Sequence, residues 1–365
     1  MSPAPIKAQA WRYPVDLSTW DGHKSLELHE VKITPPKQGE VSQAWLFADS
    51  LLRTNFVICR DIMISNKSYR GPYSTGPDGQ GHIPLSDGAG EVVSVGDGVT
   101  QWKQGDRVHS LFFETWFDGP NKAEYMSRAV GGSTSGCLTQ YRVFDAQALL
   151  SIPPHLSYEE AATIPCAALT AWQSFFEKQP MTKDSTVLVL GSGGVSVFGA
   201  QLAKAAGARV IATTSSKEKE AKYKALGADE VINYREVAQW WEEVRELTRG
   251  EGVEQVLEVG GQGTLIQSLK SVARQGHVHV IGVLTQGDPT DETIQDLASV
   301  LLFGQATMSG TFVGSKVMCE RLDDFMTKHR IKPVVDRVFG WTEVVDAFDY
   351  QLNGSHFGKV VIRID

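Results

Sequence analysis

A glycine-rich turn in the middle of the chain carries the clearest chemical pattern in the sequence. The apolar run Val187–Leu190 predicts a strand, and residues 194–206 predict a helix with alanine-rich apolar faces. Between them, Gly191 permits a tight turn, and Gly193 lets the backbone approach a bound anion closely. The start of a helix also offers free N–H groups and the positive end of its dipole. The pattern therefore favours binding of a dinucleotide pyrophosphate, and the alternative is a turn with only a structural role.

The glycine pattern departs from GxGxxG at its third position. Ser196 replaces the third glycine, and its small side chain still permits close packing of the helix on the strand. Gly199 lies one turn later and is available for the same purpose. Because glycine-rich turns occur in many folds, the surrounding strand–helix–strand unit is what supports the dinucleotide interpretation.

The second strand of this unit predicts which dinucleotide binds. An NAD site needs an Asp or Glu at the end of that strand, where it accepts hydrogen bonds from the ribose 2′-OH. Here the strand Arg209–Thr213 leads into hydroxyl side chains and then into Lys217 and Lys219, with no carboxylate at its tip. A 2′-phosphate finds donors and positive charge there, so we expect NADPH rather than NADH. The alternative is that both lysines are only solvated helix residues.

The elements around the turn predict two kinds of domain. Residues 1–150 read mostly as short strands and turns, and residues 90–96 alternate as a half-buried strand does. Ser157 and Glu160 form a capping-box pattern that opens a helix. From there strands alternate with helices, at 187–190, 194–206, 209–213, 217–226, 231–234, 237–247, 253–258 and 277–283, and a last strand follows at 358–363. This alternation predicts a doubly wound parallel sheet, α/β in class, beside or within a β-rich domain.

One segment of the first domain does not fit its surroundings. Residues 41–58 lack the clean alternating strand that is expected after Gly39-Glu40-Val41. We expect an irregular core segment there, and the alternative is an apolar wall of a substrate pocket.

Composition excludes several classes of function. The 365 residues are 42% hydrophobic and 21% charged, with a net charge of −8, as in ordinary globular proteins. The mild acidity argues against a nucleic-acid partner or an anionic membrane. The four cysteines form no CxxC pair, and no secretory leader or membrane-spanning run is recognised. We therefore expect a cytoplasmic protein.

Several motifs in the same order resemble the medium-chain dehydrogenase/reductase superfamily over nearly the whole chain. They are the stretches 86–99, 105–108, 161–172, 226–229, 232–234, 276–283 and 356–361, in addition to the glycine turn. The resemblance implies a GroES-like β-rich catalytic domain, residues 1–165 plus 316–365, with an inserted Rossmann domain, residues 166–315. It implies an active site in the cleft between them and a homodimer formed through the edge strand near residues 307–313.

The resemblance also implies a set of cofactor-binding residues. Gly191, Ser192, Gly193, Gly194 and Val195 are expected to bind the pyrophosphate. Ser215, Ser216, Lys219 and Tyr234 are expected around the 2′-phosphate. The remaining residues are expected near the nicotinamide or elsewhere along the cofactor: Thr170, Val259, Gly282, Val283, Phe312, Val313 and Lys359.

The metal ligands of the zinc-dependent relatives are mostly missing. Ser86 stands at the position of their histidine ligand, and Ile58 stands where their first cysteine is expected, with Cys59 displaced by one residue. Only Cys166 matches a ligand position, and one thiolate does not make a three-ligand catalytic site. We therefore expect no metal and place the chain with the zinc-free, quinone oxidoreductase-like branch.

Without zinc, the simplest chemistry is hydride transfer from NADPH to the electron-poor carbon of an enone or quinone. Candidates for polar contact with such a substrate are Cys59, Asp61, Tyr69 and Ser86. Two alternatives remain open: a zinc-independent alcohol dehydrogenase or carbonyl reductase acting on C=O, and a non-catalytic NADPH-binding protein.

Overall fold

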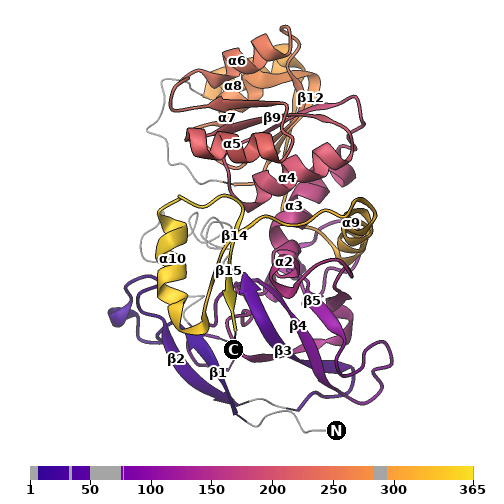
Figure 1. Cartoon of the computed structure of the whole chain (residues 1–365), viewed down its shortest axis with the longest axis vertical. Coiled ribbons are helices and arrows are strands. Elements are labelled where there is room, and N and C mark those ends of the chain that lie inside the picture. The colour runs from indigo at the N-terminus through magenta and orange to yellow at the C-terminus, as the bar shows by residue number, and fades with distance from the viewer. Residues whose placement is uncertain (1–6, 33–34, 50–74, 77, 283–293, 365) are drawn as a thin grey trace. The chain divides into compact units, whose positions relative to one another are not determined.

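The computed structural model describes residues 7–32, 35–49, 75–76, 78–282 and 294–364 (Figure 1). The chain divides into two compact units: unit 1 comprises Met1–Leu169 and Gly314–Asp365, and unit 2 comprises Thr170–Val313. The sequence placed the corresponding boundaries after residues 165 and 315. The candidate residues Cys59, Asp61, Tyr69 and Val283 lie outside the described residues.

Unit 1 is rich in β-strands, as expected of a GroES-like domain. Its main sheet has the order β14-β15-β3-β4-β5-β7, and β6 pairs with β3. Its strands are β3 (Glu40–Asp49), β4 (Asp87–Val95), β5 (Arg107–Ser110), β6 (Tyr141–Asp145), β7 (Leu149–Ser151), β14 (Val335–Phe339) and β15 (Lys359–Arg363). A separate antiparallel pair joins β1 (Lys7–Arg12) to β2 (Glu27–Lys32). The helices include α2 (Tyr158–Ala161), α9 (Lys316–His329) and α10 (Val344–Leu352).

The core of unit 1 joins segments that are far apart in the sequence. Val41, Val92 and Val108, from three adjacent strands, pack in one buried cluster with Phe144 and with Phe348 of α10. The chain returns to this unit after leaving it, because burial of the apolar face of α10 needs the sheet made by the first segment. The expected capping box is present at α2, where the Ser157 hydroxyl accepts from the Glu160 N–H and the Glu160 carboxylate accepts from the Ser157 N–H.

The expectation of an irregular segment after Val41 is met only in part. Its first part forms a strand, but the pairing with β4 shifts register between Ser42 and Gln43 and between Trp45 and Phe47. Residues 40–49 form β3, the longest strand of this sheet, and residues 50–58 lie outside the described residues. β3 pairs with β4 along one edge and with β6 and β15 along the other. Pairing on both edges satisfies the backbone of a strand whose side-chain pattern is weak, so tertiary context overrides the local signal.

Unit 2 contains the doubly wound parallel sheet that the sequence predicts. Its six strands have the order β10-β9-β8-β11-β12-β13, and all the neighbouring pairs are parallel. The strands are β8 (Thr186–Val189), β9 (Arg209–Thr214), β10 (Glu230–Asn233), β11 (Val253–Glu258), β12 (Val272–Val280) and β13 (Thr307–Gly310). The helices are α3 (Leu169–Trp172), α4 (Gly194–Ala205), α5 (Lys217–Ala225), α6 (Trp240–Leu247), α7 (Leu265–Ser271) and α8 (Ile294–Gly304).

The order of the strands sets where a ligand can bind. From β8 the chain first moves through α4 and α5 to β9 and β10, and it then crosses to β11 and continues in the opposite direction. Helix α7 contacts both α6 and α8, while α4 contacts β8 and β9, and α5 contacts β9 and β10. The strand order reverses between β8 and β11, and ligands of such sheets bind at the carboxyl ends of the strands at this switch point.

Within the described residues, no helix is long and apolar enough to cross a membrane.

Candidate functional site

Most of the expected cofactor residues follow the carboxyl ends of the strands of unit 2. The glycine turn follows β8, Ser215 and Ser216 follow β9, and Tyr234 follows β10. On the other side of the switch point, Val259 follows β11, Gly282 follows β12, and Phe312 and Val313 follow β13. Because all six strands are parallel, these ends lie along one edge of the sheet. The fold therefore gathers residues that the sequence spreads over more than 120 positions.

The glycine turn leaves room for an anion at the start of α4. Gly191 has a φ of +73°, a conformation that favours glycine. Among the described residues, apart from the immediate chain neighbours, no atom lies within 4 Å of the position that a Cβ would take on Gly191 or on Gly193. Gly193 is the N-cap of α4 and supplies no side chain to the first N–H groups of the helix. This combination of open space and unsatisfied donors suits a pyrophosphate.

Two side chains that the sequence analysis did not single out hold this turn in place. The Gly191 N–H donates to Thr213 Oγ1 at 3.2 Å, and the Tyr223 hydroxyl donates to the Gly191 carbonyl at 2.6 Å. Tyr223 lies on α5 and is fully buried, and burial raises the pKa of its phenol, which therefore stays a donor. Both polar backbone groups of Gly191 are thus fixed by β9 and α5, the elements that also border the expected 2′-phosphate site.

The two small residues of α4 have separate roles. The Ser196 hydroxyl donates to the Leu190 carbonyl at 2.6 Å, which ties the helix to the end of the preceding strand. A Cβ on Gly199 would lie 2.4 Å from Leu257 Cδ1 and 3.3 Å from Val189 Cγ1. The close approach of α4 to β8 and β11 therefore depends on Gly199, as the sequence suggested.

The region after β9 presents hydroxyl and amine groups. Ser216 is the N-cap of α5, and its hydroxyl oxygen accepts from the Lys219 N–H at 3.3 Å, which leaves its proton available for donation. Lys219 is 7% exposed, and the Tyr234 ring is 41% exposed. The Tyr234 N–H donates to the Thr214 carbonyl at 3.0 Å, so the ends of β9 and β10 stay together. The nearest acidic residue in sequence, Glu218, is exposed and pairs with Lys222.

A buried carboxyl group organises the other half of the edge. Glu258, at the end of β11, accepts from the N–H groups of Gly260 and Gly261 at 2.7 and 2.9 Å. It also accepts from the hydroxyls of Thr264, at 2.6 Å, and of Ser268. Burial raises the pKa of this carboxyl. From the sequence, Glu258 was only the last residue of a predicted strand.

The same residue joins two strand ends through its backbone. The Glu258 carbonyl accepts from the N–H groups of Ile281 and Gly282, at 2.8 and 3.2 Å. A Cβ on Gly282 would lie 2.3 Å from the Val259 carbonyl oxygen, so only glycine allows this approach. Val259 and Gly282, both expected at the cofactor, are therefore held against each other. On the neighbouring strand, the Thr311 N–H donates to the Val280 carbonyl at 2.9 Å.

Three further expected residues take part in structural contacts. Val313 is buried and has a φ of +52°, which is strained for a β-branched residue. Thr170 is buried, and its carbonyl accepts from the Ser174 hydroxyl at 2.9 Å. In unit 1, Lys359 is buried at the start of β15, where its N–H donates to the Val334 carbonyl.

The described residues do not fit a catalytic zinc at the position used by the zinc-dependent relatives. Ser86, which replaces the histidine ligand, is fully buried, and its hydroxyl donates to Asp87 Oδ1 at 2.8 Å. Cys166 is also fully buried, and within the described ranges it belongs to no group of three His, Cys, Asp or Glu side chains with donor atoms close together. A catalytic zinc needs three protein ligands of this kind. Cys59 lies outside the described residues.

Comparison with known proteins gives consistent matches over both units. Residues 54–154 match the family model of the alcohol dehydrogenase GroES-like domain, and residues 194–328 match the model of the zinc-binding dehydrogenases. A zinc-type alcohol dehydrogenase-like protein of Schizosaccharomyces pombe is 40% identical over 285 residues, which cover 78% of this chain and 82% of that protein. A 2-methylene-furan-3-one reductase of Solanum lycopersicum is 32% identical over 288 residues, or 77% of this chain and 63% of that protein.

A solved structure extends the similarity to the whole fold. A structure described as a candidate alcohol dehydrogenase from Sinorhizobium meliloti superposes with a TM-score of 0.85 at 34% identity, and 99% of each chain is covered.

Proposed function

Because the chain belongs to the medium-chain dehydrogenase/reductase superfamily of nicotinamide-dependent oxidoreductases, we propose that it is an NADPH-dependent reductase of enones or quinones that works without zinc. The observation that carries the proposal is the edge of the unit 2 sheet. There an open glycine turn stands beside hydroxyl and lysine side chains, with no carboxylate directly after β9.

The preference for NADPH follows from charge at the end of β9. Ser215 and Ser216 offer hydroxyl donors, and Lys219, on the first turn of α5, adds a positive charge. The N-terminus of α5 adds further N–H groups and the positive end of a helix dipole. A ribose 2′-phosphate is an anion that each of these features stabilises. A 2′-OH would find no carboxylate acceptor at this position, which disfavours NADH.

The two halves of this sheet edge, on either side of the switch point between β8 and β11, bind different parts of the cofactor. The turn Gly191–Val195 receives the pyrophosphate, and the pair Val259 and Gly282 borders the nicotinamide end. NADPH held at this edge would supply a hydride to the electron-poor carbon of the substrate. With one proton from water or a side chain, an enone would become the saturated ketone and a quinone the hydroquinone. Candidate residues for substrate contact remain Cys59, Asp61, Tyr69 and Ser86.

Reduction of a conjugated C=C bond needs less from the protein than oxidation of an alcohol. Alcohol oxidation requires loss of the hydroxyl proton, which zinc promotes by lowering the pKa of the bound oxygen. With Ser86 and the buried Cys166 at two of the three ligand positions, that assistance is not supported. An enone needs only hydrogen-bond donors at its oxygen. The similarity to a plant enone reductase supports the same class of substrate.

A second candidate activity is zinc-independent reduction or oxidation at C=O. The similarity to alcohol dehydrogenase-like proteins favours it.

We further propose the domain ranges and the cytoplasmic location stated above, and a homodimer formed through β13. This strand is the last in the strand order of the described sheet, and its outer side is available for pairing.

The test is a titration of metal-stripped protein with NADPH and with NADH, followed by turnover assays with an enone and a quinone. Tight NADPH binding, weak NADH binding and turnover that survives chelation are the expected results. A preference for NADH would contradict the role of Ser215 and Lys219, and activity that depends on added zinc would contradict the metal-free mechanism. A saturated ketone as product supports C=C reduction, whereas an allylic alcohol supports the C=O alternative. Cofactor binding without turnover of any carbonyl substrate would favour a non-catalytic protein.

A further inference from the structure

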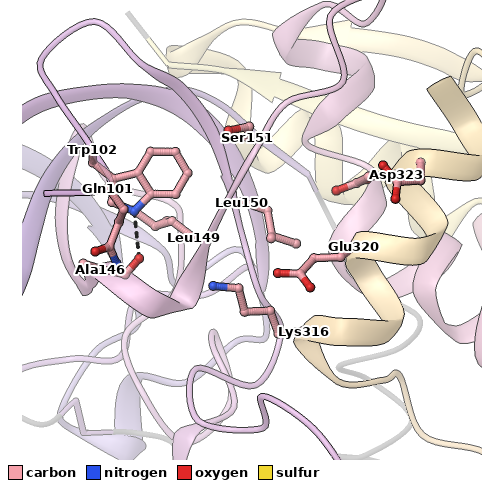
Figure 2. A pocket seen from close by; sticks show the side chains of 10 residues that line it. Gln101, Trp102, Ala146, Leu149, Leu150, Ser151, Lys316, Glu320 and Asp323 are labelled. Carbon is pink, nitrogen blue, oxygen red and sulfur yellow. Dashed lines mark hydrogen bonds between the residues drawn. The ribbon is translucent and has the colours of Figure 1, made fainter.

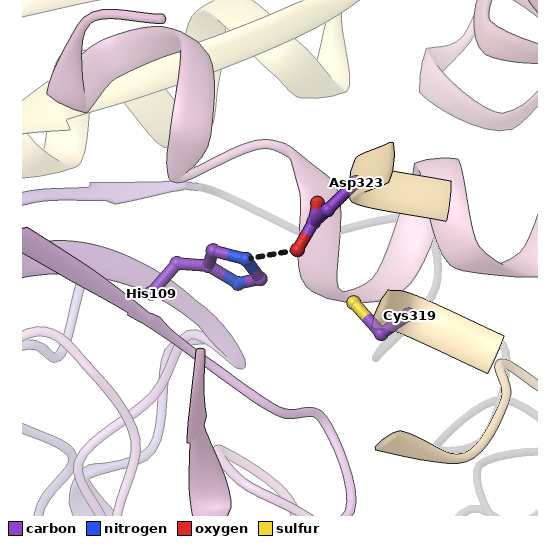
Figure 3. A group of neighbouring side chains, drawn as sticks. All are labelled: His109, Cys319 and Asp323. Atoms are coloured by element: carbon purple, nitrogen blue, oxygen red, sulfur yellow. Dashed lines mark hydrogen bonds and ion pairs between the residues drawn. The ribbon is translucent and has the colours of Figure 1, made fainter. Parts of the chain in front are cut away.

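Unit 1 contains a buried group of three metal-ligating side chains that the proposed function does not use. His109 lies on β5, while Cys319 and Asp323 lie one turn apart on α9 and therefore share a face of that helix. One donor atom from each of the three lies within 4.8 Å of the other two (Figure 3). His109 and Cys319 are fully buried, and the Asp323 side chain is 13% exposed.

The orientation of the imidazole resembles that of a metal-bound histidine. His109 Nδ1 lies 3.1 Å from the Ser110 carbonyl oxygen, and since a carbonyl only accepts, Nδ1 carries a proton. This contact fixes the ring and directs Nε2 toward the group, as the outer partners of metal-bound histidines do. Nε2 lies 3.0 Å from Asp323 Oδ2, so these two atoms share one proton. A divalent cation can replace that proton.

One oxygen of the group has no partner. Asp323 Oδ1 is buried and makes no hydrogen bond to any described residue. Buried polar atoms are rarely left in this state, and metal coordination is one of the arrangements that satisfies them. The shared proton explains only one of the two carboxylate oxygens, so the His109–Asp323 contact alone does not account for the whole group.

A cavity of about 420 Å³ lies beside Asp323 (Figure 2). Its lining includes Glu320, Asp323 and Asp324, with Lys316 as its one ammonium group. The Lys316 ammonium donates to the Gln147 carbonyl at 2.7 Å. The excess of carboxylates attracts cations to the side of the group that Asp323 forms, while His109 and Cys319 do not line this space.

We propose that His109 Nε2, Cys319 Sγ and a carboxylate oxygen of Asp323 bind one divalent transition-metal ion, with zinc as the best match to this donor set. Nitrogen, sulfur and oxygen donors in tetrahedral geometry are those that zinc prefers, and a water takes the fourth position. The ligand atoms of such a site are about 3.5 Å apart, so the present separations close by small side-chain movements. Binding releases the thiol proton and the shared proton, and the thiolate and carboxylate neutralise the ion.

The proposed ligands include neither Ser86 nor Cys166, which stand at the zinc position of the relatives, although Asp87, next to Ser86, acts electrostatically on both His109 and Cys319. The proposal does not rest on the proposed function. The effect of the site is to link β5 to α9 and so to join the two sequence segments of unit 1. The expectation from the sequence that the chain holds no metal is revised for this site alone. Neither Cys319 nor Asp323 belongs to a local sequence motif, so no pattern pointed to this group.

The test is a titration of the chelator-treated full chain with Co²⁺, followed by absorption spectroscopy. The expected result is a thiolate-to-cobalt charge-transfer band together with intense visible bands of tetrahedral Co²⁺, saturating at one ion per chain. Zn²⁺ is expected to displace Co²⁺ and to raise the Tm. Wild-type protein that shows no charge-transfer band would overturn the proposal without recourse to any variant.

Matched cysteine variants distinguish this site from other thiols. Cys319→Ala is expected to abolish the band and to weaken binding by more than the roughly 10- to 100-fold loss typical of outer partners. Cys166→Ala and Cys137→Ala remove fully buried thiols outside the group and are expected to keep the band. If Cys166→Ala removes the band and Cys319→Ala does not, the ion binds at the position of the relatives and the proposal is wrong. Proton release on Zn²⁺ binding, measured in weak buffer, provides a second readout.

Discussion

Glu258 offers the sharpest test of how the chain shapes the proposed nicotinamide end of the cofactor site. Glu258→Ala removes the acceptor for two buried N–H groups and two hydroxyls. The hydroxyls can rotate to other acceptors, but the N–H groups of Gly260 and Gly261 cannot, and each buried donor left without a partner costs about 1–3 kcal/mol. Removing a desolvated carboxyl offsets part of this cost. We therefore expect a loss of about 2–4 kcal/mol in the free energy of unfolding.

Two further variants serve as controls. One removes only the charge of Glu258, and the other removes a different carboxylate from the same strand. Glu258→Gln keeps one oxygen acceptor for Gly260 and Gly261, so its loss is expected to be about 1 kcal/mol. Glu254→Ala is the matched control, because Glu254 lies near the amino end of the same strand, is exposed and accepts from the Thr186 N–H.

Burial raises the pKa of Glu258, so the folded chain binds a proton more tightly than the unfolded chain does. Wild-type stability is thus expected to fall as the pH rises through the raised pKa, and Glu258→Gln should remove this slope.

The functional assay compares NADPH with a fragment that contains only its adenosine 2′-phosphate part. Calorimetric titration measures NADPH, which is proposed to span both halves of the edge, and adenosine 2′,5′-bisphosphate, which is proposed to bind only the half near β9. Glu258→Ala is expected to weaken NADPH about 10-fold, equivalent to about 1.4 kcal/mol, and to leave the fragment unchanged. If both ligands weaken equally, Glu258 acts on the whole unit rather than on the nicotinamide end. If neither weakens and the Tm is unchanged, the hydrogen bonds assigned to Glu258 do not hold this edge.

Three other predictions follow from the same geometry. Tyr223→Phe leaves the Gly191 carbonyl without its donor and is expected to lower the free energy of unfolding by about 1 kcal/mol and NADPH affinity a few-fold, measured by thermal denaturation and calorimetry. Ser215→Asp places a carboxylate at the expected 2′-phosphate and should weaken NADPH at least about 10-fold with NADH unchanged; equal losses for both cofactors would argue against this position of the phosphate. His279 lies buried against Gln255, and burial lowers its pKa to about 3, so the unfolded chain binds the extra proton. Stability should therefore be complete above about pH 6.5 and fall by up to about 1.4 kcal/mol per pH unit toward pH 3, and His279→Gln should flatten this profile in acid denaturation; an unchanged profile would mean that another group controls acid unfolding.

The glycine turn and its flanking elements were predictable because the signal is local. A strand, two glycines and a helix start occupy adjacent positions, and the residue types at each position favour that element. The predicted strand 253–258 coincides with β11, and the predicted helix 194–206 differs from α4 by one residue. Parallel strands then place all their carboxyl ends at one edge without further information. This is why the expected cofactor residues that directly follow the strands of unit 2 lie along one edge of its sheet.

The supporting contacts were not predictable because they join distant positions. Tyr223 reaches Gly191 across 32 residues, and His109 reaches Asp323 across 214. The irregular pattern after Val41 did not reveal a strand as long as β3 for a related reason. A strand paired on both edges, as β3 is, receives its stability from partners that a local window does not contain.

The third glycine of the motif is replaced here by Ser196, and its structural role is taken over by Gly199. In the GxGxxG pattern the third glycine allows the helix to approach the strand. Here Gly199 meets that need, because any side chain there would collide with Leu257. Ser196 is therefore free to carry a hydroxyl, which donates to the Leu190 carbonyl at the end of the strand and satisfies a buried acceptor. A serine in place of glycine thus strengthens the strand–helix junction instead of weakening it, and the departure from the motif is no argument against dinucleotide binding.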